Sequence, residues 1–299
     1  MTELTVVLMC HNRPLLAVGA IQSILAQSNG NFRFLISDNS SNHQLKKIIG
    51  SEYPTLEYIS WFPGLPDFFT HFNTMIQKVD TPLVVMFHDD DRLEPDYVKR
   101  VLEQYHETPN VAGIGTNCFQ IDGRGERVPG DLWFKSPNAI EIFRDPKDLV
   151  MRQLELDLGR AAPFTNYAYN LNVVKDPSLD LSKGRNYCDV SFLAGILRFG
   201  PIVWINEPLA SVRVHGANIS TDSGVRDYKA FLTWIRLEFG DTICRASIDE
   251  YRWPRVYFSS AKRKRFSLAV IKYLLLSFPR LMFRSRSFRG KILKKLFSH

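Results

Sequence analysis

The sequence predicts an α/β fold in which a mostly parallel sheet has helices on both faces. Over the first hundred residues, short apolar runs alternate with segments whose apolar residues recur at helical spacing, and such alternation is typical of right-handed βαβ units. Polar residues directly follow three of the apolar runs, at the strand ends where open parallel sheets bind ligands. With 45% hydrophobic and 23% charged residues, the 299-residue chain has the composition of a globular protein.

The first strands and helices follow from short runs rich in β-branched and aromatic residues and from the spacing between them. Strands are predicted at residues 4–9, 32–37, 56–60 and 83–88. Helices are predicted at residues 14–27, about 43–49 and 67–79, and Pro14 is well placed to begin the first of them. The less regular region that follows predicts strands at 111–121 and 202–205, a tight hairpin turn at 122–125, and helices at 145–158, 187–199 and 226–254.

Several protein classes are excluded by motifs that the sequence lacks. It contains no GxxxxGK[ST] loop and no GxSxG elbow, and Gly113-Ile114-Gly115 lacks the third glycine of a dinucleotide fingerprint. The four cysteines form no CxxC pair, so we expect a reducing compartment rather than a disulfide framework; they are Cys10, Cys118, Cys188 and Cys244. The apolar N-terminus has no basic n-region and no small-residue cleavage site, and is interpreted as the first strand rather than as a signal peptide.

Three adjacent acidic residues, Asp89, Asp90 and Asp91, follow the predicted strand at 83–88. Adjacent carboxylates repel one another unless a cation or water offsets their charge. Carboxylate oxygens are suitable ligands for Mg²⁺ or Mn²⁺, which complete their shells with water and phosphate oxygens. The run therefore indicates a site for a metal ion and a nucleotide diphosphate. The alternative is a solvated acidic loop, or the N-terminus of a helix that begins near Pro95.

Asp38 ends the second predicted strand and is followed by Asn39, Ser40 and Ser41. This composition is typical of turns, so Asp38 taken alone predicts an Asx-turn. The functional alternative is a carboxylate at the sheet edge that accepts hydrogen bonds from the base or ribose of a nucleotide.

The order of these segments resembles the family 2 glycosyltransferases of the GT-A fold. The resemblance rests on TVVLMCHNRPLLAVGAIQSILAQ, FLISDNSS and LVVMFHDDDRLEPDYV, and on YCDVSFLAGILRFGPIVWINEPLASVRVHGANIS at residues 187–220. It covers roughly residues 3 to 222 and depends on the order and spacing of the motifs together. It implies a Rossmann-like mixed, mostly parallel sheet flanked by helices, with a nucleotide-binding half at 1–110 and an acceptor half at 111–225.

The resemblance also implies roles for individual acidic residues. Asp38 would contact the base or ribose, Asp89 would lie on the nucleotide side of the metal motif, and Asp90 would be the direct ligand of Mn²⁺ or Mg²⁺. Asp91 would be the additional acid of a His-Asp-Asp-Asp variant and a further candidate ligand. Asp189 would be the general base of an inverting enzyme.

Three further residues match positions of the same family. Arg213 is expected to bind diphosphate oxygens, since a guanidinium forms two parallel hydrogen bonds with such groups. His215 is expected to bind the metal ion or to donate to a phosphate. His11, where many relatives have tyrosine, is expected to lie near the base.

The general-base role for Asp189 also has a physical basis. Inversion by direct displacement needs a carboxylate that removes the proton from the acceptor hydroxyl, while the metal ion offsets the charge of the leaving group. Asp189 precedes the apolar run VSFLAGIL, and a position at a helix N-terminus favours the ionised carboxylate. A simple helix cap is the alternative.

The C-terminal region, residues 226–299, is predicted to be helical, basic and membrane-associating. From residue 255 the chain has 13 Lys and Arg residues and no acidic residue, which leaves 25 basic against 31 acidic residues in the remainder. The apolar run 266–278, interrupted by Lys272, is shorter than the roughly 20 residues that span a bilayer. We therefore expect contact with the surface of an anionic membrane. The alternatives are packing on the acidic body and RNA binding.

Together these observations predict a metal-dependent glycosyltransferase located in the cytoplasm and peripherally bound to the inner face of the cell membrane. The expected donor is a nucleotide-diphosphate sugar, and the expected acceptor is a lipid-linked glycan of the bacterial surface, such as an O-antigen or capsule unit. No nucleic-acid partner is expected. The alternatives are a nucleotidyltransferase, or a membrane-associated binding protein with an inactive transferase domain.

Overall fold

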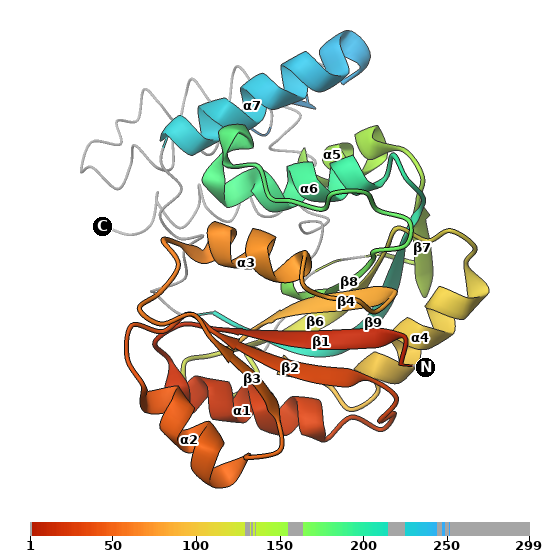
Figure 1. Ribbon diagram of the computed structural model, residues 1–299. Coiled ribbons are helices and arrows are strands. Elements are labelled where there is room, and N and C mark those ends of the chain that lie inside the picture. Colours follow the sequence, from red (N-terminus) through yellow and green to blue (C-terminus); the bar gives the residue numbers. More distant parts are fainter. Residues whose placement is uncertain are drawn as a thin grey trace, which may run out of the picture.

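The computed structural model describes residues 2–128, 132, 134, 136–154, 164–214, 225–243, 247–248 and 251 (Figure 1). The predictions for His215, for the end of the helix at 145–158 and for the tail beyond residue 251 lie outside these residues. Within them, the chain forms one mixed sheet with helices on both faces, which confirms the predicted fold class.

The sheet has the order β3-β2-β1-β4-β8-β6-β9-β5, with β7 paired alongside β9. The strands are Leu4–Cys10 (β1), Arg33–Asp38 (β2), Glu57–Ser60 (β3), Leu83–His88 (β4), Arg92–Leu93 (β5), Gly113–Ile121 (β6), Ile140–Phe143 (β7), Tyr167–Asn170 (β8) and Ile202–Arg213 (β9). The α-helices are Pro14–Leu25 (α1), Gln44–Glu52 (α2), Phe68–Ile76 (α3), Tyr97–Glu107 (α4), Pro146–Leu154 (α5), Cys188–Ile196 (α6) and Val225–Phe239 (α7).

The N-terminal half of the sheet is parallel, as predicted. β1 pairs with β2 on one side and with β4 on the other, both in parallel register. The chain thus moves outward from β1 through β2 to β3, and then returns to place β4 on the opposite side of β1. This reversal is a topological switch point, where loops at the carboxyl ends of two strands diverge and leave room for a ligand.

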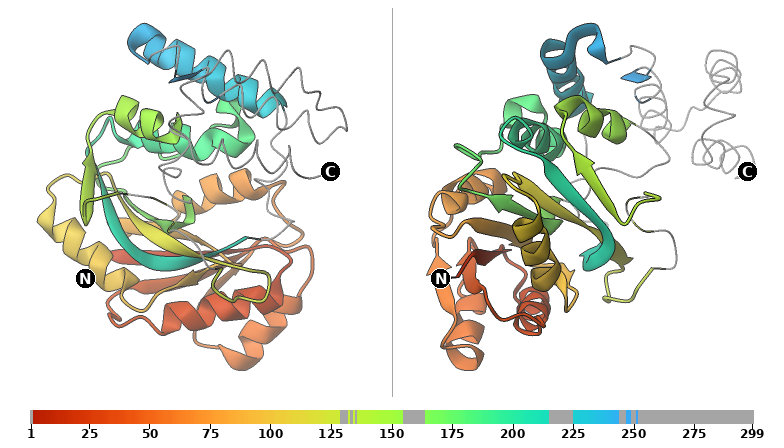
Figure 2. Two further views of the ribbon diagram at one scale, coloured as in Figure 1. Left: turned by 180° about the vertical axis from the view of Figure 1, so that it is seen from behind. Right: turned by 90° about the vertical axis from the view of Figure 1, so that its right-hand side faces the viewer.

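Alternating side chains of the central strands face two separate cores, as expected for strands buried on both faces. Val7 and Met9 pack into a core with α3, α5, α6 and α7, whereas Val6 and Leu8 pack into a core with α1, α2 and α4. Figure 2 shows the helices on the two faces of the sheet from two further directions, with α7 as an outer layer beyond α5 and α6.

The second half of the sheet contains strands that the sequence did not predict. β8 is antiparallel to both β4 and β6 and lies between them, and β9 extends eight residues beyond the predicted strand at 202–205. The first part of β9 pairs with β7, and its last part pairs with β5. The predicted turn at 122–125 is confirmed, because the N–H of Asp122 donates to the carbonyl of Glu126.

Gly115 is explained by packing in β6 rather than by nucleotide binding. A Cβ atom at this position would lie 2.5 Å from the ring of Tyr167 and 2.8 Å from the ring of Trp204. Both rings are buried, so the glycine allows them to lie directly against the backbone of the strand.

The predicted boundary between residues 225 and 226 stays a prediction, and α7 begins at that point. Tyr228, Phe231 and Ile235 of α7 are buried in the same core as α6. No helix among the described residues is both long enough and apolar enough to cross a membrane.

Candidate active site

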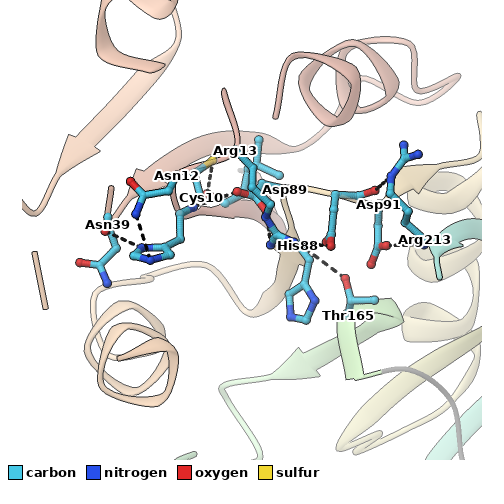
Figure 3. A network of polar contacts seen from close by, with 12 residues as sticks. Cys10, Asn12, Arg13, Asn39, His88, Asp89, Asp91, Thr165 and Arg213 are labelled. Atoms are coloured by element: carbon cyan, nitrogen blue, oxygen red, sulfur yellow. Dashed lines mark hydrogen bonds and ion pairs between the residues drawn. The ribbon is translucent and has the colours of Figure 1, made fainter. Parts of the chain in front are cut away.

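Three loops meet at the carboxyl edge of the sheet, next to the switch point between β1 and β4. The backbone N–H of His11, after β1, donates to Oδ2 of Asp89, after β4, over 2.8 Å. The N–H of Asn12 donates to Oγ of Ser40, after β2, over the same distance. Figure 3 shows polar residues of these loops, among them Asn12, Asn39 and Asp89. The predicted gathering of polar residues from separate strands at one edge is therefore confirmed.

Asp89 is fully buried, and Arg13 supplies the opposite charge. The Nη2 atom of Arg13 lies 2.5 Å from Oδ1 of Asp89, and its Nη1 atom pairs with Oδ2 of Asp90. Burial raises the pKa of Asp89 to about 7, although Arg13 and the N–H of His11 favour the ionised form. One guanidinium thus bridges two adjacent carboxylates, and it does so from the residue before α1. The nucleotide contact predicted for Asp89 stays a prediction.

Arg213, the last residue of β9, is bound to the acidic loop by its backbone and its side chain. Its N–H donates to Oδ1 of Asp91 over 2.9 Å, and its Nε donates to the carbonyl of Asp90 over 2.9 Å. Its Nη1 also donates to the carbonyl of Asp122 over 2.7 Å. Burial and the neighbouring charge of Asp90 raise the pKa of Asp91 well above its ordinary value, and the N–H of Arg213 opposes this shift. The diphosphate contact predicted for Arg213 stays a prediction.

His88, the last residue of β4, adds a nitrogen to the acidic cluster. Ligand atoms of His88, Asp90 and Asp91 all lie within 4.8 Å of one another. Nε2 of His88 is buried and has no hydrogen-bond partner among the described residues. One imidazole and two carboxylates are a donor set that fits a divalent ion, so these residues agree with the predicted Mn²⁺ or Mg²⁺.

Asp38 ends β2, on the other side of β1 from this cluster, and is buried with both carboxylate oxygens engaged. Its Oδ1 accepts the N–H of Ser40 over 2.9 Å, which confirms the predicted Asx-turn. Its Oδ2 accepts the hydroxyl of Tyr58 over 2.6 Å. Burial and this hydrogen bond raise the pKa of Tyr58 above its ordinary value. The nucleotide contact predicted for Asp38 stays a prediction.

His11 is exposed at the same edge. Its Nδ1 lies 2.8 Å from the carbonyl oxygen of Asn39, so the ring position is set by the loop after β2. Asn39 in turn accepts the N–H of Leu65 over 2.6 Å and thereby connects the loop after β3 to this corner. The predicted position of His11 near a base stays a prediction.

Asp189 lies in the first turn of α6, as the sequence predicts. Its carboxylate accepts the N–H of Val190 over 2.8 Å. Burial and the nearby charge of Asp189 raise the pKa of Tyr167, the first residue of β8. Two residues before Tyr167, Oγ1 of Thr165 accepts the N–H of His88 over 3.1 Å. The start of β8 is therefore close to both Asp189 and the acidic loop. The general-base role of Asp189 stays a prediction.

Sequence reasoning missed Arg13 and His88 as parts of this site. The sequence position of Arg13 could have predicted its role. A basic residue at the end of the loop after β1 lies next to the loop that follows the neighbouring parallel strand, β4. The position of His88 could also have predicted its role, because a histidine at the end of an otherwise apolar strand is a polar residue at the ligand-binding edge of the sheet.

The chain matches known glycosyltransferases in sequence pattern and in fold. Residues 5–166 match the pattern of "Glycosyl transferase family 2". The crystal structure of residues 1–349 of TarS from S. aureus, in complex with UDP-GlcNAc, superposes with a TM-score of 0.62 at 14% identity, covering 87% of this chain and 74% of that one. The mannosyltransferase PcManGT from Pyrobaculum calidifontis, in complex with GDP-Man and Mn²⁺, gives 0.53 at 11% identity, covering 99% and 87%. No curated protein sequence matches this one.

The sheet order, the switch point and the acidic loop beside it define a fold of the GT-A type. Because the family pattern covers more than half of its length, the chain belongs to glycosyl transferase family 2. It is a glycosyltransferase, and the predicted family and class of enzyme are confirmed.

Proposed function

We propose that this chain transfers a sugar from a nucleotide-diphosphate donor with the help of Mn²⁺ or Mg²⁺ bound by Asp90 and Asp91. The observation that carries the proposal is the convergence of these carboxylates with His88 within 4.8 Å, at the switch point of the sheet. The solved structures that share the fold support it, since they contain UDP-GlcNAc in one case and GDP-Man with Mn²⁺ in the other.

The donor would lie across the edge formed by the loops after β1, β2 and β4. We propose that Asp38 and His11 contact its base and ribose, and that the diphosphate lies toward Asp90 and Asp91. Bound there, the ion would offset the negative charge that develops on the diphosphate leaving group. The nucleotide contact of Asp89 and the diphosphate contact of Arg213 are part of this proposal. Both residues would also orient the loop, because Asp89 accepts the N–H of His11 and Arg213 donates to the carbonyl of Asp90. We also propose that His215 binds the metal ion or donates a hydrogen bond to a phosphate of the donor.

Asp189 is proposed as the base of an inverting reaction. Its carboxylate would remove the proton from the acceptor hydroxyl as that oxygen attacks the anomeric carbon from the face opposite the diphosphate. The position in the first turn of α6 supports this role, since the positive end of the helix dipole stabilises the ionised carboxylate.

The proposed acceptor is a lipid-linked glycan of a bacterial surface polysaccharide, such as an O-antigen or capsule unit. The basic residues beyond position 255 support this proposal, because they would attract an anionic membrane at the cytoplasmic face, at about 1 kcal/mol each. In this account residues 1–225 form the catalytic unit, and residues 226–299 bring it to the membrane.

A donor screen tests the proposal. Purified protein is incubated with UDP-, GDP- and dTDP-sugars and MnCl₂, and the shift in melting temperature and the slow release of nucleoside diphosphate are measured. We expect one nucleotide class to stabilise the protein and to be hydrolysed, and Asp90→Asn to abolish both effects. The matched control is Asp241→Asn, which changes an exposed acid outside the site. Absence of stabilisation and release with every donor would refute the proposal.

A further inference from the structure

The imidazole of His88 is held in a fixed position at the end of β4. Its backbone N–H donates to Oγ1 of Thr165 over 3.1 Å, and its ring packs edge-on against Phe68 with 5.2 Å between centroids. The ring nitrogen Nε2 is buried and has no hydrogen-bond partner among the described residues. A buried polar atom without a partner destabilises a fold, so this nitrogen requires an explanation.

The two nearest ligand groups are also fixed by hydrogen bonds and ion pairs. Asp91 accepts the N–H of Arg213, and Asp90 pairs with Arg13. The three ligand atoms lie within 4.8 Å of one another. Since ligands lie about 2.0–2.3 Å from a small divalent ion, two ligands of one ion are at most about 4–5 Å apart. The three groups are therefore close enough to share a single ion.

We infer that His88 is a nitrogen ligand of the divalent ion, completing a His-Asp-Asp site that favours first-row transition ions over Mg²⁺. This inference rests on the proposed function, which assigns the ion to Asp90 and Asp91. Mg²⁺ prefers a nearly ideal octahedron of oxygen ligands, so an imidazole contributes little to its binding. Transition ions gain from the same imidazole. His88 thus determines the selectivity for transition ions over Mg²⁺, whereas the carboxylates supply the negative charge that binds both kinds of ion.

Pulsed electron paramagnetic resonance of the full chain with Mn²⁺ and without nucleotide tests the inference, because a directly bound imidazole gives a ¹⁴N modulation. We expect this modulation in the wild type, its replacement by a ¹⁵N signal after labelling with [¹⁵N]histidine, and its loss in His88→Gln. In competition titrations, His88→Gln should weaken Mn²⁺ binding roughly tenfold or more, and should leave Mg²⁺ binding within about twofold. The matched control, His106→Gln, changes an exposed histidine on α4.

The outcomes separate this inference from the proposed function. Mn²⁺ bound without nitrogen modulation, or with a modulation that persists in His88→Gln, overturns the ligand role and leaves the carboxylate site standing. Loss of the signal in His215→Gln but not in His88→Gln assigns the nitrogen to His215 and also overturns it. If the wild type binds no Mn²⁺, both proposals fail. Should His88→Gln not fold, His88→Asn and His215→Gln are compared with the wild type: a nitrogen signal that only His88→Asn loses supports the inference, and a signal that only His215→Gln loses overturns it.

Discussion

The backbone N–H of Arg213 donates to Oδ1 of Asp91 over 2.9 Å, although 122 positions separate the two residues in the chain. This contact joins the end of β9 to the loop after β4. The acidic loop is therefore oriented from two sides, by Arg213 on one and by Arg13 on the other. A carboxylate cluster fixed before its ligands arrive needs little rearrangement to bind them, which favours tight binding.

The hydrogen bonds of the Arg213 side chain are expected to contribute to stability and to Mn²⁺ binding. Arg213→Lys keeps the charge but cannot donate to the carbonyls of both Asp90 and Asp122 as the guanidinium does. We expect a loss of about 1–3 kcal/mol in the free energy of unfolding, together with weaker Mn²⁺ binding. Denaturant unfolding and Mn²⁺ titration measure the two effects. The control is Arg226→Lys at an exposed position of α7; equal behaviour of the two variants would show that the contacts of Arg213 are unimportant.

Arg13 predicts a stability loss that depends on the metal ion. Arg13→Gln leaves the buried carboxylate of Asp89 without its compensating charge. Because the Arg13 side chain is 37% exposed, we expect a loss of about 2 kcal/mol in the metal-free protein, between the values typical of a surface pair and of a fully buried pair. MnCl₂ should restore much of it. Arg33→Gln, which removes surface ion pairs, should cost less and be insensitive to Mn²⁺. A loss from Arg13→Gln that Mn²⁺ leaves unchanged would contradict this account.

His71 of α3 predicts a pH dependence of stability. Trp61 Nε1 donates to Oγ of Ser37, and this oxygen lies 2.7 Å from Nε2 of His71. A neutral ring that accepts the Ser37 hydroxyl completes this chain of hydrogen bonds, whereas a protonated ring cannot accept it. Burial, with a smaller contribution from the charge of His11, lowers the pKa of His71 to about 4.

The sign of the effect follows from the two protonation states. Between about pH 6.5 and pH 4 the unfolded chain binds a proton on His71 that the folded protein does not, so stability falls as the pH falls. The wild type should lose on the order of 2–3 kcal/mol relative to His71→Gln across this range. Urea unfolding at several pH values measures the difference. His106→Gln is the exposed control, and parallel pH profiles for the wild type and His71→Gln would rule out the shifted pKa.

Asp189→Asn tests the proposed base. The amide preserves the size of the side chain but cannot take a proton from the acceptor, so transfer should fall by at least roughly a hundredfold while donor binding is retained. Calorimetry with the donor and a transfer assay separate the two effects, and Asp176→Asn is an exposed control. The anomeric configuration of the product, measured by NMR, gives an independent answer: retention of configuration excludes Asp189 as the base of an inverting reaction.

The parallel half of the fold could be predicted because each of its elements has a local signal. β1 and β4 are continuous apolar runs buried on both faces, and Pro14 begins α1 as expected. The antiparallel strands could not be predicted in this way. β5, β7 and β8 have two to four residues each and lie in the less regular part of the chain. Their place in the sheet depends on pairing with neighbouring strands.

Part of the candidate site could be predicted because it lies at the ends of strands that have a local signal in the sequence. The position of Asp38 and Asp90 follows from the rule that ligands bind at the carboxyl ends of parallel strands. The links made by Arg13 and Arg213 depend on which strands become neighbours and on the exact end of β9. Neither is encoded in local spacing. The sequence alone therefore indicates Asp38 and Asp90 as candidate site residues, but it does not indicate the nitrogen of His88 or that two arginines hold the acidic loop in place.

The proposed function requires that Asp90 and Asp91 bind a divalent ion that in turn binds the nucleotide diphosphate. Its most direct test is calorimetric titration of the wild type and of Asp90→Asn with the nucleoside diphosphate selected by the donor screen, with and without MnCl₂. We predict that Mn²⁺ raises the affinity of the wild type roughly tenfold or more, equivalent to about 1.4 kcal/mol, and that Asp90→Asn abolishes this gain while Asp241→Asn keeps it. Nucleotide binding that is equally tight without Mn²⁺, or an unchanged gain in Asp90→Asn, would contradict this requirement.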